Sequence, residues 1–250
     1  MVRVPSVEEE TARDLVRSRE DTRADLMTDR HRLSKLLLRH GHVYSGGTAW
    51  TRTHDRWLRA HRAGDLAFQA AFDASYEAVI HTVARRDRLD QAISLMAADS
   101  QFTPMVDRLG CLRGIGPLTG FALAVEITDW HRFTGKTIGA FIGLVPSEYS
   151  SGQSRTLGSI TKTGNSHARR LLVEAGWQHR RGYPPGPSSV MRARWERAPA
   201  EARLRGQAGN QRLHRQWVAF TVRKKRPVVA NVAVARQLAG WCWSLAVMDE

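Results

Sequence analysis

The sequence has few cysteines and no long apolar run, and these two absences exclude several classes of protein. Its 250 residues include only two cysteines, Cys111 and Cys242, which cannot form a disulfide framework and have neither metal-ligand nor redox spacing. Both lie in apolar surroundings, so we expect buried free thiols. No apolar run reaches the length of about 18 residues that a membrane span needs, and no signal peptide is recognisable. We therefore expect a cytoplasmic protein with no membrane partner.

Acidic residues are too few to balance the basic ones, which indicates a polyanionic partner. The chain has 38 lysines and arginines against 24 acidic residues, a formal net charge of +14. Residues 151–226 hold 17 of the basic residues and 3 of the acidic ones, so this stretch carries the whole excess. A localised basic segment favours a nucleic-acid-binding face, whereas an evenly basic chain would indicate solubility alone.

Helical periodicity dominates the first hundred residues. Four leucines between residues 15 and 37 recur at intervals that keep them on one face, at about 3.6 residues per turn. After a loop at 42–53, a second apolar stripe runs from residue 68 to residue 96. Two long amphipathic helices joined by a loop predict an antiparallel, coiled-coil-like hairpin over residues 1–100. Stripes of this length also predict a homo-oligomer, because one small domain cannot bury them.

Beyond residue 100 the composition changes, because glycine becomes frequent and short helical patterns alternate with turns. We expect a compact domain over residues 101–181. A basic and partly mobile segment should follow over 182–227, since its cluster of prolines cannot continue a helix. The apolar residues 228–250 predict a final helix that docks on the domain. The chain as a whole is thus predicted to be mainly α-helical.

Residues 112–119 have the glycine pattern of a helix-hairpin-helix turn. Gly114 and Gly116 let the backbone turn sharply and approach a phosphate with no side chain in the way. The amides that open the following helix favour an anion, so the turn predicts sequence-independent contact with a nucleic-acid backbone. An ordinary helix–helix corner with a glycine cap is the alternative.

Residues 143–165 bring small hydroxyl residues, glycines and cations together. Ser151 stands before Gly152, which places its hydroxyl on exposed and permissive backbone. Arg155 and Lys162 are close enough in sequence to neutralise a phosphate beside that hydroxyl. On residue types alone, the segment predicts a phosphate-binding loop, and a nucleophilic serine is a rarer use of a Ser-Gly turn.

A further helix is predicted to begin near His167. Arg169 and Arg170 stand at its start, where we expect them to reach phosphates, and a solvated helix face is the alternative. His167 can assist proton transfer, although a lone histidine is more often structural.

In their order, these motifs resemble insertion-sequence transposases of the IS110 type, relatives of the Piv-type DNA invertases that are also called bridge recombinases. The series is specific, whereas each motif alone is common. The resemblance implies a transposase domain in which the serine before the glycine, Ser151, attacks DNA and forms a phosphoserine link, with Ser150 as its close competitor. The residues that carry the resemblance are Gly-Ile-Gly-Pro at 114–117, Phe-Ile-Gly-Leu-Val-Pro at 141–146, Tyr-Ser-Ser-Gly at 149–152, residues 158–164, and the helix with Arg169 and Arg170.

The resemblance also implies parts that this sequence does not display. Members of the family begin with a RuvC-like domain whose acidic residues bind divalent metal such as Mg²⁺, and they bind structured RNA as well as double-stranded DNA. No counterpart of that acidic domain is recognisable here, so we expect a portion that binds nucleic acid, has no metal ligands of its own and performs little strand transfer alone. Two other hypotheses fit the same residues: a non-catalytic helix-hairpin-helix DNA-binding module, and a structural protein that binds RNA through its basic segment.

Overall fold

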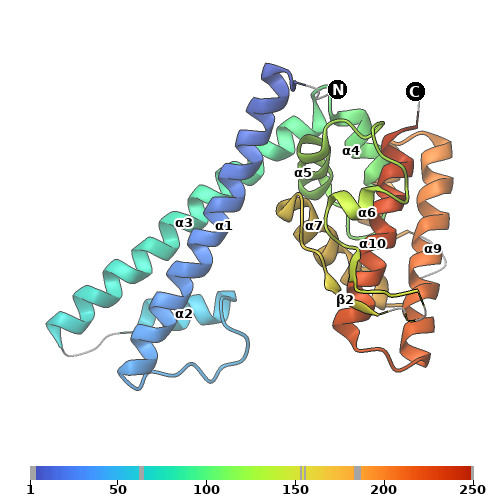
Figure 1. Cartoon of the computed structure of the whole chain (residues 1–250). Coiled ribbons are helices and arrows are strands. Elements are labelled where there is room, and N and C mark those ends of the chain that lie inside the picture. Colours follow the sequence, from blue (N-terminus) through green and yellow to red (C-terminus); the bar gives the residue numbers. More distant parts are fainter. Residues whose placement is uncertain (1–3, 62–64, 153, 155, 183–186, 249–250) are drawn as a thin grey trace. The chain divides into compact units, whose positions relative to one another are not determined.

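The computed structural model describes residues 4–61, 65–152, 154, 156–182 and 187–248, and it confirms the prediction of a mainly α-helical chain (Figure 1). The chain forms two compact units. The smaller one is Arg17–Gln91, and the larger one combines Met1–Val16 with Ala92–Glu250. None of the helices within the described ranges is long and apolar enough to cross a membrane.

The smaller unit contains α2 (Arg52–Ala60) and most of two long helices, α1 (Val7–Arg39) and α3 (Leu66–Ala98). Within this unit α1 and α3 run antiparallel, as their polar contacts show: residue numbers that increase along α1 pair with residue numbers that decrease along α3. These contacts are Arg19–Asp90 at 2.7 Å, Asp25–Arg85 at 2.8 Å and Asp29–Thr82 at 2.8 Å. Leucines of α1 meet aromatic and aliphatic residues of α2 and α3 in the core, which comprises Leu26, Leu33, Leu36, Leu37, Leu58, Phe68, Phe72 and Val79.

In the larger unit, the central helix is α10 (Pro227–Ala246). It contacts α4 (Thr103–Leu109), α6 (Ile138–Phe141), α7 (Ser166–Gly176) and α9 (Ala200–Val222). Its apolar residues are buried along most of its length, as the C-terminal run of the sequence predicts. Both cysteines are buried free thiols, as predicted. The unit also contains α5 (Pro117–Ile127), β1 (Pro146–Glu148), β2 (Leu157–Ile160), the 3₁₀ helix η1 (Trp177–Arg180) and α8 (Ser189–Trp195).

The predicted basic segment over 182–227 contains two helices, α8 and α9, and α9 is part of the core. Leu213 and Trp217 are buried on one face of α9, and the Trp217 indole donates to the carbonyl of Gly176 at 3.1 Å. Small buried residues complete that face, including Gly206, which lies against Cys111. Alanine and glycine form half of the buried face of α9. Because these small residues are only weakly apolar, the sequence of α9 shows no apolar stripe at helical spacing.

His179 in η1 is a buried histidine whose neutral form the fold favours. Its exposed fraction is 0%, and burial, with a contribution from the charge of Arg113, lowers the pKa of its imidazole to about 4 from 6.5. Because the pKa is lower in the folded chain, the unfolded chain takes up the proton first as the pH falls. The stabilisation is therefore complete above pH 6.5 and is lost as the pH drops towards 4.

We expect the free energy of unfolding to fall by up to about 3 kcal/mol across this window on account of His179. Urea denaturation at pH 7 and pH 4.5 measures the change. His179→Gln should remove this part of the pH dependence, and a variant with the same pH slope as the unaltered chain would show that His179 does not titrate in this way.

Candidate functional site

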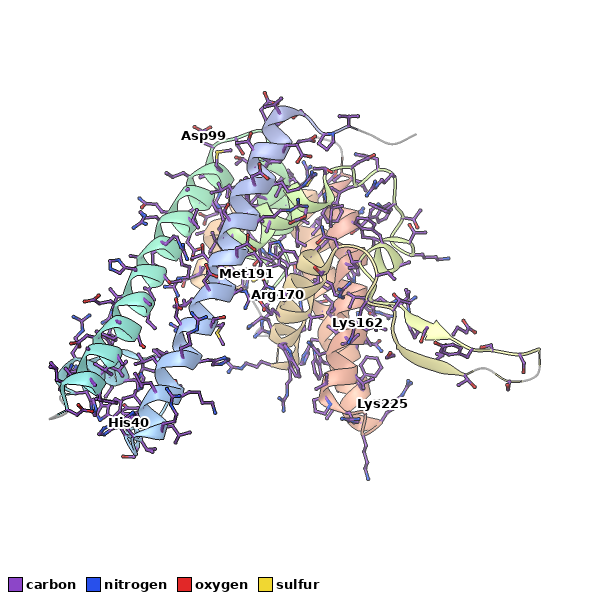
Figure 2. The ribbon with its side chains drawn as sticks, turned by 60° about the vertical axis from the view of Figure 1, so that its left-hand side comes forward. His40, Asp99, Lys162, Arg170, Met191 and Lys225 are labelled. Carbon is purple, nitrogen blue, oxygen red and sulfur yellow. The ribbon has the colours of Figure 1, made fainter. Side chains whose placement is uncertain are left out.

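A short β-hairpin presents Ser151 near its tip. β1 pairs antiparallel with β2, with Pro146 opposite Ile160 and Glu148 opposite Leu157. Beyond these strands, Ser151 and Ser154 exchange backbone hydrogen bonds of 3.0 and 3.1 Å. Ser151 is exposed, and Figure 2 shows the hairpin projecting from the helices of its unit. The predicted phosphate-binding loop is thus one hairpin, on which Ser151, Gly152 and Ser154 are exposed to solvent.

The hydroxyls of Ser150 and Ser151 have different partners. Ser150 Oγ donates to Glu148 Oε1 at 2.7 Å, whereas Ser151 Oγ lies 3.0 Å from Ser154 Oγ. A carboxylate can accept a proton from a hydroxyl that attacks, and another hydroxyl is a poor base. The two serines are therefore chemically distinct candidates, and Ser150 is the one whose hydroxyl has a base beside it on this hairpin.

Arg169 anchors the base of the hairpin. Its Nη1 donates to the carbonyl of Ile142 at 2.9 Å and to that of Thr163 at 2.8 Å, so one guanidinium joins the backbone before the hairpin to the backbone after it. Gly164 follows Thr163 at the same place, and its φ of +69° is a backbone conformation that favours glycine. A Cβ on Gly164 would lie 1.8 Å from the carbonyl oxygen of Phe141. The base is thus held by hydrogen bonds and close backbone packing, and a phosphate contact by Arg169 stays a prediction.

The buried carboxylate of Glu126, which no sequence motif predicted, binds the side chains of the segment that follows the hairpin. Glu126 in α5 is 7% exposed. One of its oxygens accepts from Asn165 Nδ2 at 2.8 Å, and the other lies 3.2 Å from His167 Nδ1. Asn165 Oδ1 in turn accepts the N–H of Ala168 at 2.8 Å and caps α7. His167 therefore has a structural partner. Glu126 and Asn165 are 39 positions apart in the sequence, which explains why no local pattern reveals the cluster.

The Gly114–Gly116 turn joins α4 to α5 and packs closely on α7. Gly114 has a φ of +88°, and a Cβ there would lie 2.7 Å from the carbonyl oxygen of Ala175. Beside Gly116, which caps α5, lies the guanidinium of Arg194, whose Nη1 donates to the carbonyl of Ile115 at 3.3 Å. The close approach gives Gly114 a packing role, and the helix-hairpin-helix contact with phosphate stays a prediction.

The remaining predicted site residues lie in three different settings. Lys162 is exposed just after β2, and its N–H donates to the carbonyl of Gly143 at 3.1 Å. Arg170 pairs with Glu174 at 2.7 Å on the surface of α7. Arg155 lies outside the described residues. No group of three His, Cys, Asp or Glu side chains in the described part of the chain can hold a metal ion.

Exposed cations gather at the corner between α9 and α10. Arg223, Lys224, Lys225 and Arg226 follow one another there, and all four are exposed. Figure 2 shows Lys225 extending from the end of this corner. Four consecutive cations at this corner produce a local concentration of positive charge.

Comparison with known proteins places this site in a recognised domain. Residues 106–187 match the model of the Transposase IS116/IS110/IS902 family, a range that includes the Gly114 turn, the hairpin and α7. The putative transposase y4qE of Sinorhizobium fredii is 31% identical over 244 residues, which cover 97% of this chain and 59% of that protein. The transposase for insertion sequence element IS1533 of Leptospira borgpetersenii is 29% identical over 225 residues, 89% of this chain and 64% of that protein.

The chain therefore spans less than two thirds of the length of these two relatives, while nearly all of it aligns with the first. The transposase for insertion sequence element IS1328 of Yersinia enterocolitica is 41% identical over 68 residues, which are 27% of this chain and 20% of that protein. Through the domain at residues 106–187, the chain belongs to the IS116/IS110/IS902 family of insertion-sequence transposases.

Proposed function

We propose that this chain is the DNA-joining part of a transposase and that Ser151 is its nucleophile. The observation that carries the proposal is an exposed serine near the tip of a hairpin whose base is fixed, inside a transposase-family domain. A hydrogen-bonded base and the exposed position of Ser151 let its hydroxyl approach a phosphodiester without interference from the helices. Positioning of this kind supplies much of the rate in phosphoryl transfer.

In the proposed step, Ser151 Oγ attacks a phosphorus atom of the DNA backbone. The Oγ–P bond forms, the bond from phosphorus to one deoxyribose oxygen breaks, and the serine proton ends on the released hydroxyl. One phosphodiester replaces another, so the reverse attack by a new DNA hydroxyl rejoins the strand without external energy. A cation that offsets the charge on the phosphate oxygens must lie close to Ser151. Lys162 follows β2 at the base of the hairpin, the opposite end from Ser151, so it is placed to bind a phosphate farther along the DNA.

We also propose that residues 151–226 provide most of the affinity for double-stranded DNA. Arg169, Arg170 and Arg194 are engaged within the chain, which leaves Lys162 and the Arg223–Arg226 corner as the clearest phosphate ligands. A structured RNA is the further partner that we propose, from the resemblance to the family. The second copy of the chain stays a prediction, because most residues of the apolar stripes pack against one another within the smaller unit.

DNA affinity should depend steeply on salt. Each phosphate contact on B-form DNA contributes about 0.9 to the slope of log K against log salt, so about eight contacts give a slope near −7. Fluorescence anisotropy between 50 and 200 mM salt measures this slope, and the double variant Arg223→Ala/Lys224→Ala should reduce it by about 2. Arg52→Ala/Arg56→Ala on α2 removes the same charge and should leave it unchanged. An affinity that does not change with salt would refute the proposed interface.

A further inference from the structure

A groove of about 1010 Å³ lies beside the base of the hairpin, between α6 and the first half of α10. Three cations line it: Lys136 before α6, Lys225 at the α9–α10 corner and Arg236 on α10. All three are exposed, and none forms an ion pair with another residue that the structure describes. No acidic residue is among its lining residues within the described ranges. The groove therefore carries uncompensated positive charge.

The walls of the same groove are apolar. Val228 and Val229 in the first turn of α10 are 62% and 55% exposed, and Leu157 at the start of β2 is 49% exposed. Exposed apolar side chains that lie together indicate a surface that a ligand covers. A ligand for this groove must offer apolar faces and negative charge together.

Single-stranded nucleic acid offers both, because the faces of its bases are free and its phosphates are charged. A duplex stacks its bases inside the helix, so it presents phosphates to the cations but no apolar face to Val228, Val229 and Leu157. The groove chemistry thus favours unpaired nucleotides over a duplex.

We propose that this groove binds unpaired nucleotides of the DNA strand beside the phosphodiester that Ser151 attacks. This inference rests on the proposed function and specifies the form of its substrate. One hairpin connects the two places, since Leu157 and Ile160 of β2 line the groove and Ser151 lies near the tip. A strand that passes from one partner to another must leave its duplex, and the groove holds it while it is unpaired.

Binding of a single-stranded oligonucleotide and of the duplex with the same sequence, both by fluorescence anisotropy, tests the proposal. Each phosphate contact on a single strand contributes about 0.7 to the salt slope, so Lys136→Ala/Lys225→Ala/Arg236→Ala should lower that slope by about 2. The duplex slope should change by less than half as much. The triple variant Arg52→Ala/Arg56→Ala/Arg88→Ala removes the same charge from exposed positions of the smaller unit and should change neither.

A second pair of variants tests the apolar wall. Val229→Glu should weaken single-strand binding severalfold more than Val222→Glu, which adds the same charge to a valine that is 76% exposed on α9 and lines a different hollow. Equal effects of these two changes, an equal loss of single-strand and duplex binding in the cation variant, or no loss at all would each overturn the proposal. These assays measure binding and need no covalent reaction. A chain that binds single strands in the groove but forms no adduct would therefore contradict the proposal that Ser151 is the nucleophile and leave the groove proposal intact.

Discussion

Ser151→Ala should abolish the covalent protein–DNA adduct while leaving DNA affinity nearly unchanged. The Oγ atom forms the bond to phosphorus, and removal of a serine nucleophile costs a serine hydrolase on the order of 10⁶ in rate. The side chain lies exposed near the hairpin tip, so its loss disturbs neither the anchored base nor the cations of the α9–α10 corner. Denaturing gels of labelled DNA detect the adduct, in reactions supplied with the RuvC-like domain, the RNA and the Mg²⁺ that the family resemblance implies.

Ser150→Ala is the matched control, because it removes the neighbouring hydroxyl from the same hairpin. We expect the adduct to persist in this variant. If the adduct is lost in Ser150→Ala and retained in Ser151→Ala, the nucleophile is Ser150, and its bond to Glu148 supplies the reason. If both variants form the adduct, the serine mechanism is wrong. If the unaltered chain binds DNA and never forms an adduct, the chain is a non-catalytic DNA-binding module.

Gly164→Ala should destabilise the fold by at least about 2 kcal/mol. An L-residue at the φ of +69° found here costs about 1–2 kcal/mol. The added Cβ would also lie 1.8 Å from the carbonyl oxygen of Phe141, a backbone atom that moves only if the base of the hairpin moves. Thermal or urea denaturation measures the loss of stability.

Gly152→Ala, on the same hairpin, is the control for this prediction. A Cβ on Gly152 meets no atom within 4 Å, so we expect a change in the free energy of unfolding within about 0.5 kcal/mol. Gly164→Ala with the stability of the unaltered chain would show that the base of the hairpin is not held as described.

The sequence predicted best those features that depend on local periodicity. The leucine spacing of α1 and the apolar run of α10 indicated helices, and a mainly α-helical chain is what the structure shows. For the β-hairpin the sequence predicts only a loop, because β1 and β2 have just 3 and 4 residues and no alternation of apolar and polar side chains. For α9, the buried glycines and alanines gave no apolar stripe.

The features of the site that the sequence did not reveal all depend on contacts between distant segments. Two adjacent arginines at a helix start suggest phosphate ligands, yet Arg169 finds its acceptors in two backbone carbonyls, which no side-chain pattern encodes. The carboxylate of Glu126 and the cations of the groove likewise come together only when α5, α6, α7 and α10 pack. Ser151 itself was predicted from the family motif, and its position near an exposed tip fits that prediction without testing its chemistry.

The central claim is that Ser151 becomes joined to DNA, and direct identification of the linked residue tests it. The adduct is trapped by denaturation, digested with nuclease and protease, and analysed by tandem mass spectrometry. We predict a nucleotide joined through phosphate to the side-chain oxygen of Ser151. A nucleotide on Ser150 or on any other residue would contradict the account.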